Sequence, residues 1–560
     1  MNLFDAIFKQ SLLDCTAILY EERQISYGEL RDETLGVARV LSELGIGPGQ
    51  RVALMLNDSP EFLESFIAIC SYGAIAVPIN MGLRVDEQRA ILNDCTARFA
   101  IVEENVANAI RVDASEDLPH LAVLVVISRD DLDDKRELTT ETQTGVPARA
   151  ARVGWERTQR QHREEDSGAL SISSFADLMG QAKASLQKHP SQVRFPEPSD
   201  NQPAFIFYTS GSTGEPKGAV HRQADIFYTN ETYCREVLRV REGDRLFSSS
   251  RLPFAYGFGN SFTFPLLNGC TTILCREKPA PEVITQVFAK YKPTIFFGVP
   301  VIYRLLLDYH KNNSSLDCSS LRLCVSAGEA LPAHLGEECE KTFGVEVLDG
   351  IGSTEMLHMW MSNHEDEVVY GSSGKLLQSY EARLLDPDGH QTPQGVEGNL
   401  WVKGASAAIG YWQRPETTAN TFVDGWVRTG DLYRCDTHGY WFHMGRSDDC
   451  FKSSGQWVSP VEVEGVLLRY QGVSRAAVVE DFDDNGLPCA CAFIIREGVA
   501  DDPAVFEEGL RELARAALPR FKQPRRYVFV EELPYTATGK IQRFKLRDRL
   551  RAVQSPTSNV

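Results

Sequence analysis

The sequence lacks an uninterrupted apolar run long enough to cross a membrane as a helix. Its two longest apolar stretches, residues 66–79 and 294–303, are interrupted by glycine and proline, whereas a spanning helix needs about 20 consecutive apolar residues. The first ten residues, M-N-L-F-D-A-I-F-K-Q, contain an acid and no long apolar stretch of the kind found in a signal peptide. The sequence therefore predicts a protein with neither a membrane span nor a secretory leader.

Positive charge and paired cysteines are also scarce. The chain carries 58 Lys and Arg against 77 Asp and Glu, and its formal net charge of −19 argues against nucleic acid or an anionic membrane as the main partner. Thirteen cysteines are an odd number without a repeating spacing, so a disulfide framework is not indicated. Cys489 and Cys491 lie in an apolar run and are better explained as strand interior than as a metal site. We therefore expect a reduced, cytoplasmic protein.

Length and periodicity indicate an α/β protein with more than one domain. A chain of 560 residues is too long for one compact core, and 43% hydrophobic with 9% aromatic content is that of a globular protein. In the first 130 residues, a helical spacing of apolar residues over 27–44 alternates with short buried runs at 51–56, 100–103 and 121–127. Such alternation predicts layered sheets with parallel strands.

A charge-rich segment between residues 130 and 166 interrupts this pattern. It contains many Arg, Glu, Gln and Thr residues and has no apolar periodicity. The sequence therefore predicts a flexible surface insertion, with a charged regulatory segment as the alternative. Helical spacing returns over 173–186.

The stretch from Phe207 to His221, F-Y-T-S-G-S-T-G-E-P-K-G-A-V-H, has the composition of a polyphosphate-binding loop. Apolar residues on both sides predict a strand–loop–strand unit. Glycines bring backbone N–H groups close to an anion, hydroxyls donate to phosphate oxygens, and a lysine adds a mobile positive charge. The residues with these properties are Thr209, Ser210, Gly211, Ser212, Thr213, Gly214 and Lys217. The spacing is not that of a P-loop, and a merely flexible polar loop is the alternative.

The motif T-S-G-S-T-G-E-P-K-G resembles the signature of the adenylate-forming enzymes, which include acyl-CoA synthetases, peptide-synthetase adenylation domains and luciferases. Further motifs of that family follow in the expected order over nearly the whole chain. They are D-G-I-G-S-T-E at 349–355, R-T-G-D-L at 428–432, G-R-S-D-D at 445–449 and T-A-T-G-K-I-Q-R at 536–543. The resemblance implies ATP and coenzyme A as co-substrates and Mg²⁺ as the metal ion.

The resemblance also implies a role for individual residues in these motifs. It places adenine beside Ala327, Gly328, Glu329, Asp349 and Gly350, and the ribose hydroxyls on Asp431. It gives phosphate contacts to Thr354 and Arg446, magnesium to Glu355, and the role of catalytic lysine to Lys540. It makes Asp448 the hinge before the small domain and Gly455 the glycine that lets the thiol arm of coenzyme A pass.

An apolar and aromatic segment, L-P-F-A-Y-G-F-G at 252–259, supplies the candidate acid pocket. Taken alone it is compatible with a plain core turn, but F-A-Y-G-F-G-N-S-F-T-F-P-L resembles the benzoate-CoA ligase branch of the family. The positions that match the acid pocket of that branch are Ala255, Tyr256, Gly352, His358 and Met359. The segment has no acid to pair an α-amine, which disfavours a free amino acid. Alanine and glycine are expected to leave room for a flat ring.

The resemblance implies a two-domain fold and a two-step reaction. We expect a large N-terminal domain of layered α/β sheets with a β-barrel-like part over 1–447, and a small mobile α+β domain over 448–560. The expected activity is an AMP-forming ligase that joins an aromatic or bulky cyclic carboxylic acid to coenzyme A. The alternatives are a freestanding enzyme that loads such an acid onto an acyl carrier protein, a medium- or long-chain fatty acyl-CoA synthetase, and an inactive binding protein. A homodimer is compatible with the sequence.

The last segment of the chain is basic although the whole chain is acidic. Residues 511–551 contain twelve Lys and Arg against four acids. One interpretation is attraction for the phosphates of ATP and coenzyme A; the other is an ordinary solvated helical face.

Overall fold

The computed structural model describes most of the chain. The described residues are 1–111, 118–128, 170–188, 193–210, 216–313, 316–453, 456–483, 486–498, 502–535 and 541–554. The predicted insertion at 130–166, Gly211 to Gly214 of the phosphate loop, Gly455 and Lys540 lie outside them.

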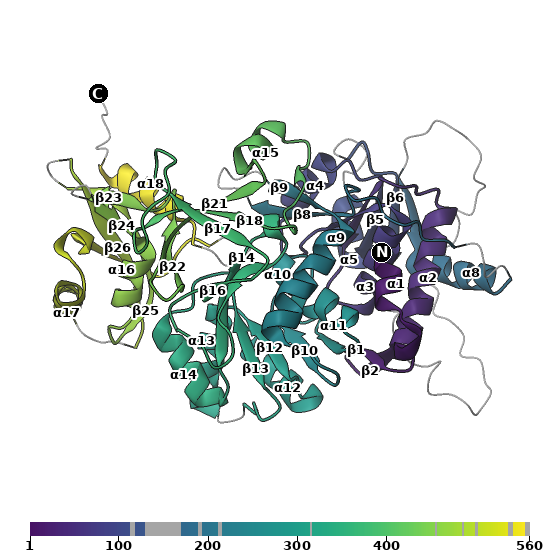
Figure 1. Ribbon diagram of the computed structural model, residues 1–560, viewed down its shortest axis with the longest axis horizontal. Helices are drawn as coiled ribbons and strands as arrows, with labels where there is room; N and C mark the ends of the chain where they lie inside the picture. The colour runs from purple at the N-terminus through teal and green to yellow at the C-terminus, as the bar shows by residue number, and fades with distance from the viewer. Residues whose placement is uncertain are drawn as a thin grey trace.

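An eight-stranded sheet lies at the N-terminal end of the molecule (Figure 1), in the order β19-β9-β8-β4-β3-β5-β6-β7. Its strands are β3 (Arg51–Met55), β4 (Ile75–Pro78), β5 (Phe99–Glu103), β6 (Val123–Ile127), β7 (Ser171–Ser174), β8 (Phe205–Ser210), β9 (Pro216–His221) and β19 (Gly410–Tyr411). The strands from β8 to β7 run parallel, as predicted, and β9 and β19 add an antiparallel edge. The helices of this part are α1 (Leu3–Ile7), η1 (Gln10–Leu12), α2 (Tyr27–Glu43), α3 (Pro60–Tyr72), α4 (Val85–Asp94), α5 (Glu104–Arg111) and α8 (Phe175–Lys188).

A nine-stranded sheet packs beside the first, in the order β16-β15-β14-β13-β12-β10-β11-β1-β2. Its strands are β1 (Thr16–Tyr20), β2 (Arg23–Ser26), β10 (Arg245–Ser248), β11 (Thr271–Leu274), β12 (Ile295–Gly298), β13 (Leu323–Ser326), β14 (Val347–Gly352), β15 (Met359–Ser362) and β16 (Lys375–Leu376). Its helices are α9 (Gln223–Thr229), η3 (Asn230–Leu238), α10 (Ala255–Phe258), η4 (Gly259–Thr263), α11 (Phe264–Leu267), α12 (Pro281–Tyr291), α13 (Pro300–Asn313), α14 (Ala333–Phe343) and η5 (Thr354–Met356). Parallel β10, β12, β13 and β14 place their carboxyl ends at one edge.

Helix α3 joins the two sheets through an aromatic core. Proline at its first turn and Gly73 at its end, with φ of 90°, fix its length. Its residues are buried from Pro60 to Ser71, and these include the acids Glu61 and Glu64 beside the apolar residues. The ring of Phe66 lies 5.5 Å from Phe205 in β8, 4.8 Å from Phe258 and 5.3 Å from Phe262. The phosphate-loop strand and the predicted acid-pocket helix are therefore packed on one another.

A five-stranded antiparallel sheet follows, where the β-barrel-like part was predicted. It consists of β17 (Glu381–Leu385), β18 (Gly398–Lys403), β20 (Phe422–Val423), β21 (Trp426–Cys435) and β22 (Trp441–Arg446), with α15 (Pro415–Thr421) beside it. In Figure 1 this sheet lies between the two large sheets and the small C-terminal part.

The small C-terminal part has the predicted α+β character. Its elements are β23 (Phe451–Ser453), β24 (Gln456–Val458), α16 (Pro460–Leu467), β25 (Val473–Phe482), β26 (Pro488–Arg496), α17 (Pro503–Ala517), η6 (Arg520–Lys522), β27 (Arg526–Phe529) and α18 (Arg543–Gln554). Ser459 caps α16 by accepting from the Glu462 N–H at 3.1 Å. The Glu462 carboxylate does not complete a capping box, because it binds Lys522 at 2.5 Å.

Two sequence expectations about elements and chemistry are refined by the structure. The helix expected from residue 173 begins at Phe175, because Ser171 to Ser174 form the edge strand β7. All thirteen cysteines are free thiols, and Cys489 and Cys491 are buried in β26. Within the described ranges no helix is long and apolar enough to cross a membrane.

Candidate active site

The phosphate-loop strands form the predicted strand–loop–strand unit. Strands β8 and β9 pair antiparallel up to Ser210 opposite Pro216, and residues 211–215 between them lie outside the described ranges. Thr209 lies opposite Lys217, and the Lys217 ammonium lies 5.9 Å from the ring centre of Tyr411. The antiparallel pairing of the two strands is a finding of the structure, and β9 pairs on its other edge with β19.

Thr354 and Glu355 lie in the short helix η5 directly after β14. The Thr354 carbonyl accepts a hydrogen bond from His221 Nε2 at 2.8 Å, and the Glu355 carbonyl accepts from the Ala408 N–H at 2.8 Å. The Glu355 carboxylate accepts from the Tyr411 hydroxyl at 2.8 Å. The predicted phosphate- and magnesium-binding pair is thus held against the end of β9 and against β19.

The predicted adenine residues meet at the carboxyl ends of β13 and β14. Ser326, the last residue of β13, is in register with Asp349 of β14, and Ala327, Gly328 and Glu329 follow directly. Gly328 has φ of 88°, a conformation that favours glycine. Asp349 and Gly350 lie within β14, and the register with β13 places them beside the turn that carries Ala327, Gly328 and Glu329.

Asp349 is a buried carboxyl group with one oxygen still available. Burial raises its pKa to about 8, although the Leu331 N–H, which donates to Oδ2 at 3.3 Å, acts in the opposite direction. Oδ1 has no hydrogen-bond partner in the part of the chain that the structure describes. A buried oxygen without a partner costs free energy, and a ligand donor at this position would remove that cost.

Asp431 and Arg446 form an ion pair across β21 and β22. The two residues are in register, and Arg446 Nη1 donates to Asp431 Oδ1 at 3.0 Å and to the Thr429 carbonyl at 2.9 Å. Nε2 of His443 lies 3.5 Å from the same carboxylate oxygen. Burial acts to raise the pKa of Asp431, but His443 and Arg446 outweigh it and hold the pKa below its usual value. The site therefore offers an ionised acceptor for a pair of hydroxyls.

The predicted hinge lies in an exposed turn over residues 447–449, between β22 and β23. Asp448 is exposed there, and the Ser447 N–H and hydroxyl both donate to the Gly430 carbonyl, at 2.9 and 3.0 Å. On the other side, Asp449 binds Arg547 of the last helix at 3.0 Å. The turn is therefore tied both to β21 and to α18.

The segment that contains Lys540 is bounded by two paired residues. Tyr535 and Ile541 pair across it. Burial raises the pKa of the Tyr535 phenol; Arg475 acts to lower it, and the Glu329 carboxylate adds to the rise.

The predicted acid-pocket residues come together as a group of rings. The ring of His358 lies 5.8 Å from Tyr256, 5.0 Å from Tyr233 and 4.7 Å from Phe264. Tyr256 donates its hydroxyl to the carbonyls of Gly298 and Val325, at 3.2 and 3.1 Å. Ala255 begins the same short helix α10 and is buried. The structure thus brings three of the five residues to one place.

Burial lowers the pKa of His358 to about 3. Neither ring nitrogen has a hydrogen-bond partner among the described residues. The ring is therefore neutral near pH 7 and carries one unused donor and one unused acceptor.

Gly352 and Met359 have packing reasons that the sequence did not show. A side chain on Gly352 would approach the His358 carbonyl to 2.6 Å, because β14 and β15 pair antiparallel there with Gly352 opposite Met359. The Met359 sulfur lies against Gly350, where an added Cβ would approach it to 2.8 Å. A Cβ on Gly352 would thus meet backbone, and the role of Gly352 in giving the acid room stays a prediction.

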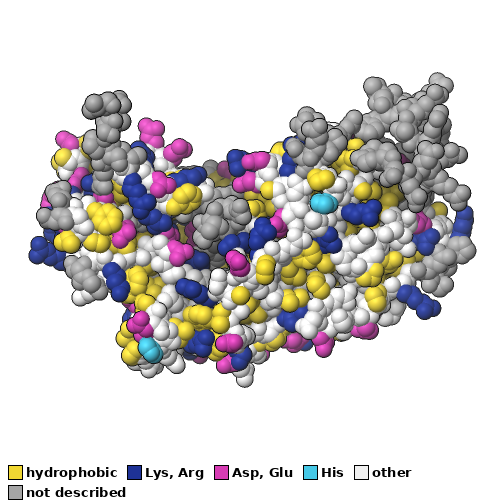
Figure 2. Space-filling view, turned by 90° about the horizontal axis from the view of Figure 1, so that it is seen from above, with side chains coloured by type: hydrophobic (Ala, Val, Ile, Leu, Met, Phe, Trp, Pro, Cys, Tyr) yellow, Lys and Arg dark blue, Asp and Glu magenta, His cyan; other side chains and the backbone are white. Residues whose placement is uncertain are grey.

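Many cations of the basic C-terminal segment are paired with acids. Among the described residues of 511–551, eight cations form ion pairs: Arg511, Arg515, Lys522, Arg525, Arg526, Arg543, Arg547 and Arg551. Arg543 binds both oxygens of Glu464 at 2.8 Å. These pairs offset part of the positive charge that would attract phosphates. On the face shown in Figure 2, acidic and basic side chains are interspersed.

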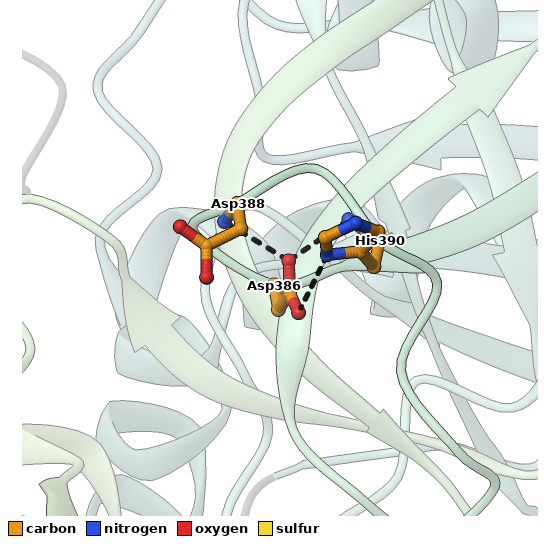
Figure 3. Close-up of side chains that lie close together, drawn as sticks. All are labelled: Asp386, Asp388 and His390. Atoms are coloured by element: carbon orange, nitrogen blue, oxygen red, sulfur yellow. Dashed lines mark hydrogen bonds and ion pairs between the residues drawn. The ribbon is translucent and has the colours of Figure 1, made fainter.

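A group of Asp386, Asp388 and His390 has the residue types of a metal site but the bonding of a turn (Figure 3). Asp386 Oδ1 accepts from the N–H groups of Asp388 and His390, at 2.9 and 2.8 Å. The three residues lie between β17 and β18, with Asp388 and His390 exposed. These bonds order the turn, and we assign no metal to it.

Three residues of the site carried no role in the sequence analysis: His221, Tyr411 and His443. His221 contacts Thr354, 133 positions away, and Tyr411 contacts Glu355, 56 positions away. His443 contacts Asp431 across the neighbouring strands β21 and β22. A single polar residue in a strand has no local pattern that distinguishes it. His221 ended the quoted loop motif, but its partners appear only in the folded chain.

Comparisons with known proteins agree over nearly the whole chain. The family model described as AMP-binding enzyme matches residues 5–412, and the model for the AMP-binding enzyme C-terminal domain matches residues 462–540. The chain is 37% identical over 510 residues to a benzoate–CoA ligase of Thauera aromatica, covering 90% of this chain and 86% of the relative. It is 33% identical over 536 residues to a 4-hydroxybenzoate–CoA/benzoate–CoA ligase of Rhodopseudomonas palustris, covering 95% and 90%.

Solved structures give the same result. An anthranilate CoA ligase in complex with anthranoyl-AMP matches with a TM-score of 0.85 and 34% identity, over 99% of this chain and 98% of the other. A benzoate CoA ligase from Burkholderia xenovorans matches with a TM-score of 0.81 and 32% identity, over 98% and 100%.

Proposed function

This chain belongs to the AMP-binding enzyme family, and we propose that it is an ATP-dependent ligase that joins an aromatic carboxylic acid to coenzyme A. The observation that carries the proposal is the group of rings around His358, which lies beside β14, the strand that bears Asp349 and leads into Thr354 and Glu355. A flat apolar acid fits such a wall. Relatives named for benzoate, hydroxybenzoate and anthranilate support the same class.

The reaction needs an activated acyl group, because a carboxylate would otherwise have to lose oxide. The acid oxygen attacks the α-phosphate of ATP, which forms an acyl-adenylate and releases pyrophosphate. The thiol of coenzyme A then attacks the acyl carbon, the bond to AMP breaks, and the thiol proton is released to solvent. Negative charge accumulates at the phosphates in the first step, so stabilisation by fixed donors and cations is required there.

The nucleotide is held by groups from three elements. Asp349 Oδ1 accepts from the adenine amino group beside Ala327, Gly328, Glu329 and Gly350. Asp431 accepts from the ribose hydroxyls, and Arg446, which already pairs with Asp431, lies beside the phosphates. Thr209 to Gly214, Lys217 and Thr354 contact the phosphate oxygens. These assignments rest on the pairing of β8 with β9, of β13 with β14 and of β21 with β22.

A magnesium ion fits the donors of this site. The Glu355 carboxylate and the Thr354 hydroxyl are hard oxygen groups next to the phosphate hairpin, and Mg²⁺ takes one or two carboxylates together with phosphate oxygens and water. When bound there, the ion neutralises charge that develops on the phosphates. Glu355 is therefore the proposed metal ligand.

The small domain supplies the remaining groups. We assign residues 1–447 to the large domain and 448–560 to the small one, with Asp448 as the hinge between them. Lys540 stabilises charge during adenylation, and a rotation at the hinge then exchanges it for the thiol path at Gly455. The turn at 447–449, in which Asp448 is exposed, supports this arrangement.

The acid pocket is formed by Ala255, Tyr256 and His358. Since His358 is neutral, the acid carboxylate gains no ion pair from it, and the ring acts as a wall with one donor and one acceptor. Tyr256 is fixed by its two carbonyl bonds and closes the other side.

A test of this function uses the purified chain with ATP, Mg²⁺ and a panel of acids. We expect pyrophosphate release with benzoate, hydroxybenzoates and aminobenzoates, and an acyl thioester when coenzyme A is added. Straight-chain acids of medium and long length form the control panel and should be poor substrates. Activity confined to the straight-chain acids would refute the aromatic assignment. Transfer of the acyl group to a holo carrier protein but not to coenzyme A would refute coenzyme A as the acceptor.

A further inference from the structure

Two side chains without a functional assignment hold Thr354 and Glu355 from opposite sides. His221 Nε2 lies 2.8 Å from the Thr354 carbonyl, and the Tyr411 hydroxyl lies 2.8 Å from Glu355 Oε1. His221 ends β9, while Tyr411 lies in β19, which pairs with β9 through Tyr411 opposite Ala219. The two contacts therefore come from neighbouring strands of one sheet.

Both ring nitrogens of His221 have hydrogen-bond partners. Its Nδ1 lies 2.9 Å from the Asp225 carboxylate, and its Nε2 lies 2.8 Å from the Thr354 carbonyl. Arg222 holds the same carboxylate, since its Nε donates to Asp225 Oδ1 at 2.9 Å and its backbone N–H to Oδ2 at 3.0 Å. His221 and Asp225 are both fully buried, so these bonds are shielded from solvent.

Arg222 extends the same network to Tyr411. Its Nη2 donates to the carbonyls of Ala405 and Ala407, at 2.9 and 3.1 Å, and the next N–H, of Ala408, donates to the Glu355 carbonyl at 2.8 Å. The chain then runs directly into Tyr411. One buried ion network thus fixes both the segment that carries Tyr411 and the backbone of Thr354.

We propose that His221 and Tyr411 are positioning residues that orient Thr354 and Glu355 for the phosphates and the divalent cation. The inference rests on the proposed function, because it takes Glu355 as the metal ligand. Tyr411 binds one oxygen of the Glu355 carboxylate, and such outer bonds fix a ligating group and are worth about 10- to 100-fold in metal affinity or activity.

The sharpest test is Tyr411→Phe, which removes the hydroxyl and leaves the ring. The binding of Mn²⁺, a paramagnetic substitute for Mg²⁺, is measured by electron paramagnetic resonance in the presence of a non-hydrolysable ATP analogue, together with KM and kcat. We expect Mn²⁺ binding to weaken about 10- to 100-fold, with KM for the acid unchanged. The matched control is Tyr370→Phe, because Tyr370 also donates to a glutamate, Glu340, at 2.8 Å and lies away from the site. Equal Mn²⁺ affinity in the wild type and in Tyr411→Phe would overturn the role of Tyr411.

The second test separates the two bonds of His221. His221→Gln retains an amide that donates toward the Thr354 carbonyl, whereas His221→Phe keeps a flat ring against Phe205 and loses both bonds. We expect His221→Phe to weaken Mn²⁺ binding and His221→Gln to restore part of it. This order of affinities is expected whether or not the two variants have the same thermal stability. Equal Mn²⁺ affinities of the wild type and both variants would overturn the role of His221. If His221→Phe does not fold, the Mn²⁺ affinities of the wild type and His221→Gln decide the role of His221. The Tyr411→Phe test does not depend on this result.

Failure of this inference is distinguishable from failure of the proposed function. A wild-type protein that binds Mn²⁺ with the ATP analogue and activates no aromatic acid refutes the substrate class and leaves the positioning test intact. A wild-type protein that activates aromatic acids while the Tyr411 and His221 variants bind Mn²⁺ normally refutes the positioning roles alone. If the wild type does not bind Mn²⁺ with the analogue, both the metal assignment of Glu355 and the positioning roles are wrong.

Discussion

The nucleotide side and the acid side of the candidate site satisfy their polar groups in opposite ways. On the nucleotide side Asp431 pairs with Arg446, and Glu355 pairs with Tyr411. On the acid side both nitrogens of His358 and the Tyr233 hydroxyl are buried without a partner among the described residues. The first side is organised before a ligand arrives, which suits the stabilisation of charge that develops during reaction. The second side relies mostly on apolar packing: the Tyr256 hydroxyl is bound to two carbonyls, and the nitrogens of His358 are left for the ligand.

This difference indicates which side sets the selectivity between acids and which side sets the rate of adenylation. Changes on the nucleotide side should alter ATP use for every acid alike, because all acids share the adenylate chemistry. Changes on the acid side should alter the ranking of acids and leave KM for ATP near its starting value. A mutation that changes both KM for ATP and the ranking of acids would show that the two sides are coupled.

The largest effect is expected from Lys540→Ala, which removes a cation from the developing phosphate charge. Loss of one such group lowers the rate about 10²- to 10³-fold. Adenylation, measured as pyrophosphate release, should fall by this factor for all acids. Transfer from supplied acyl-adenylate to coenzyme A should change far less, because the lysine has then left the site.

Gly455→Leu is the complementary variant for the second half-reaction. A side chain at this position is expected to block the thiol arm while adenylate still forms. An equal loss of both half-reactions in Lys540→Ala would contradict the division of labour between Lys540 and Gly455.

The next effect is expected from Asp431→Asn, which keeps the shape and removes the charge of the proposed ribose acceptor. Hydrogen bonds to a charged group contribute about 1.5–3 kcal/mol, so KM for ATP should rise roughly tenfold to hundredfold. The ranking of acids should not change. Asp244→Asn is the matched control, because Asp244 also forms a buried pair with an arginine, Arg322, at 2.7 Å. A similar rise of KM in the control would mean that loss of stability, and not ribose binding, is measured.

How far the sequence determined this picture depends on the range of each contact. The strands on both sides of the phosphate loop and the strand end at β13 follow from local apolar runs bounded by small residues, so they were predicted. The contact of His221 with Thr354 and the ion pairs of Lys522 with Glu462 and of Arg525 with Asp483 join residues far apart in the chain. Local periodicity contains no information about them. The same holds for Gly352, where an added Cβ would meet the backbone of His358.

A smaller effect is expected from Tyr256→Ala on the acid side. Loss of one apolar wall is worth about 1–3 kcal/mol, or roughly tenfold to a few hundredfold in the preference between acids. Bulkier acids should gain relative to benzoate, with KM for ATP nearly constant. Tyr256→Phe removes only the hydroxyl that binds the Gly298 and Val325 carbonyls and should keep the preference.

Ala255→Leu tests the same wall in the other direction. The added volume should raise KM for a ring-bearing acid and leave KM for ATP near its starting value. Unchanged ranking of acids in both Tyr256→Ala and Ala255→Leu would place the acid elsewhere.

The smallest expected effect is the release of a proton when ATP binds. Asp349 is the exception on the nucleotide side, since burial raises its pKa to about 8 and one oxygen has no partner within the described ranges. Below that pKa the free protein holds the carboxyl mostly protonated. An adenine amino group that donates to the free oxygen favours the ionised form, so the pKa falls on binding and a proton is released near pH 7.

Isothermal titration of ATP in two buffers with different ionisation enthalpies measures this proton. We expect release approaching about one proton per site near pH 7, and a decline as the pH rises above the pKa of the free protein. Asp349→Asn cannot release this proton but keeps an oxygen acceptor. Any proton release by this variant therefore comes from other groups, including ATP, and is subtracted from the wild-type value. Equal release by the wild type and Asp349→Asn would show that Asp349 does not change its charge when adenine binds. The carboxyl would then remain protonated in the complex, and the nucleotide side would contain one group that, like His358, is kept neutral by burial.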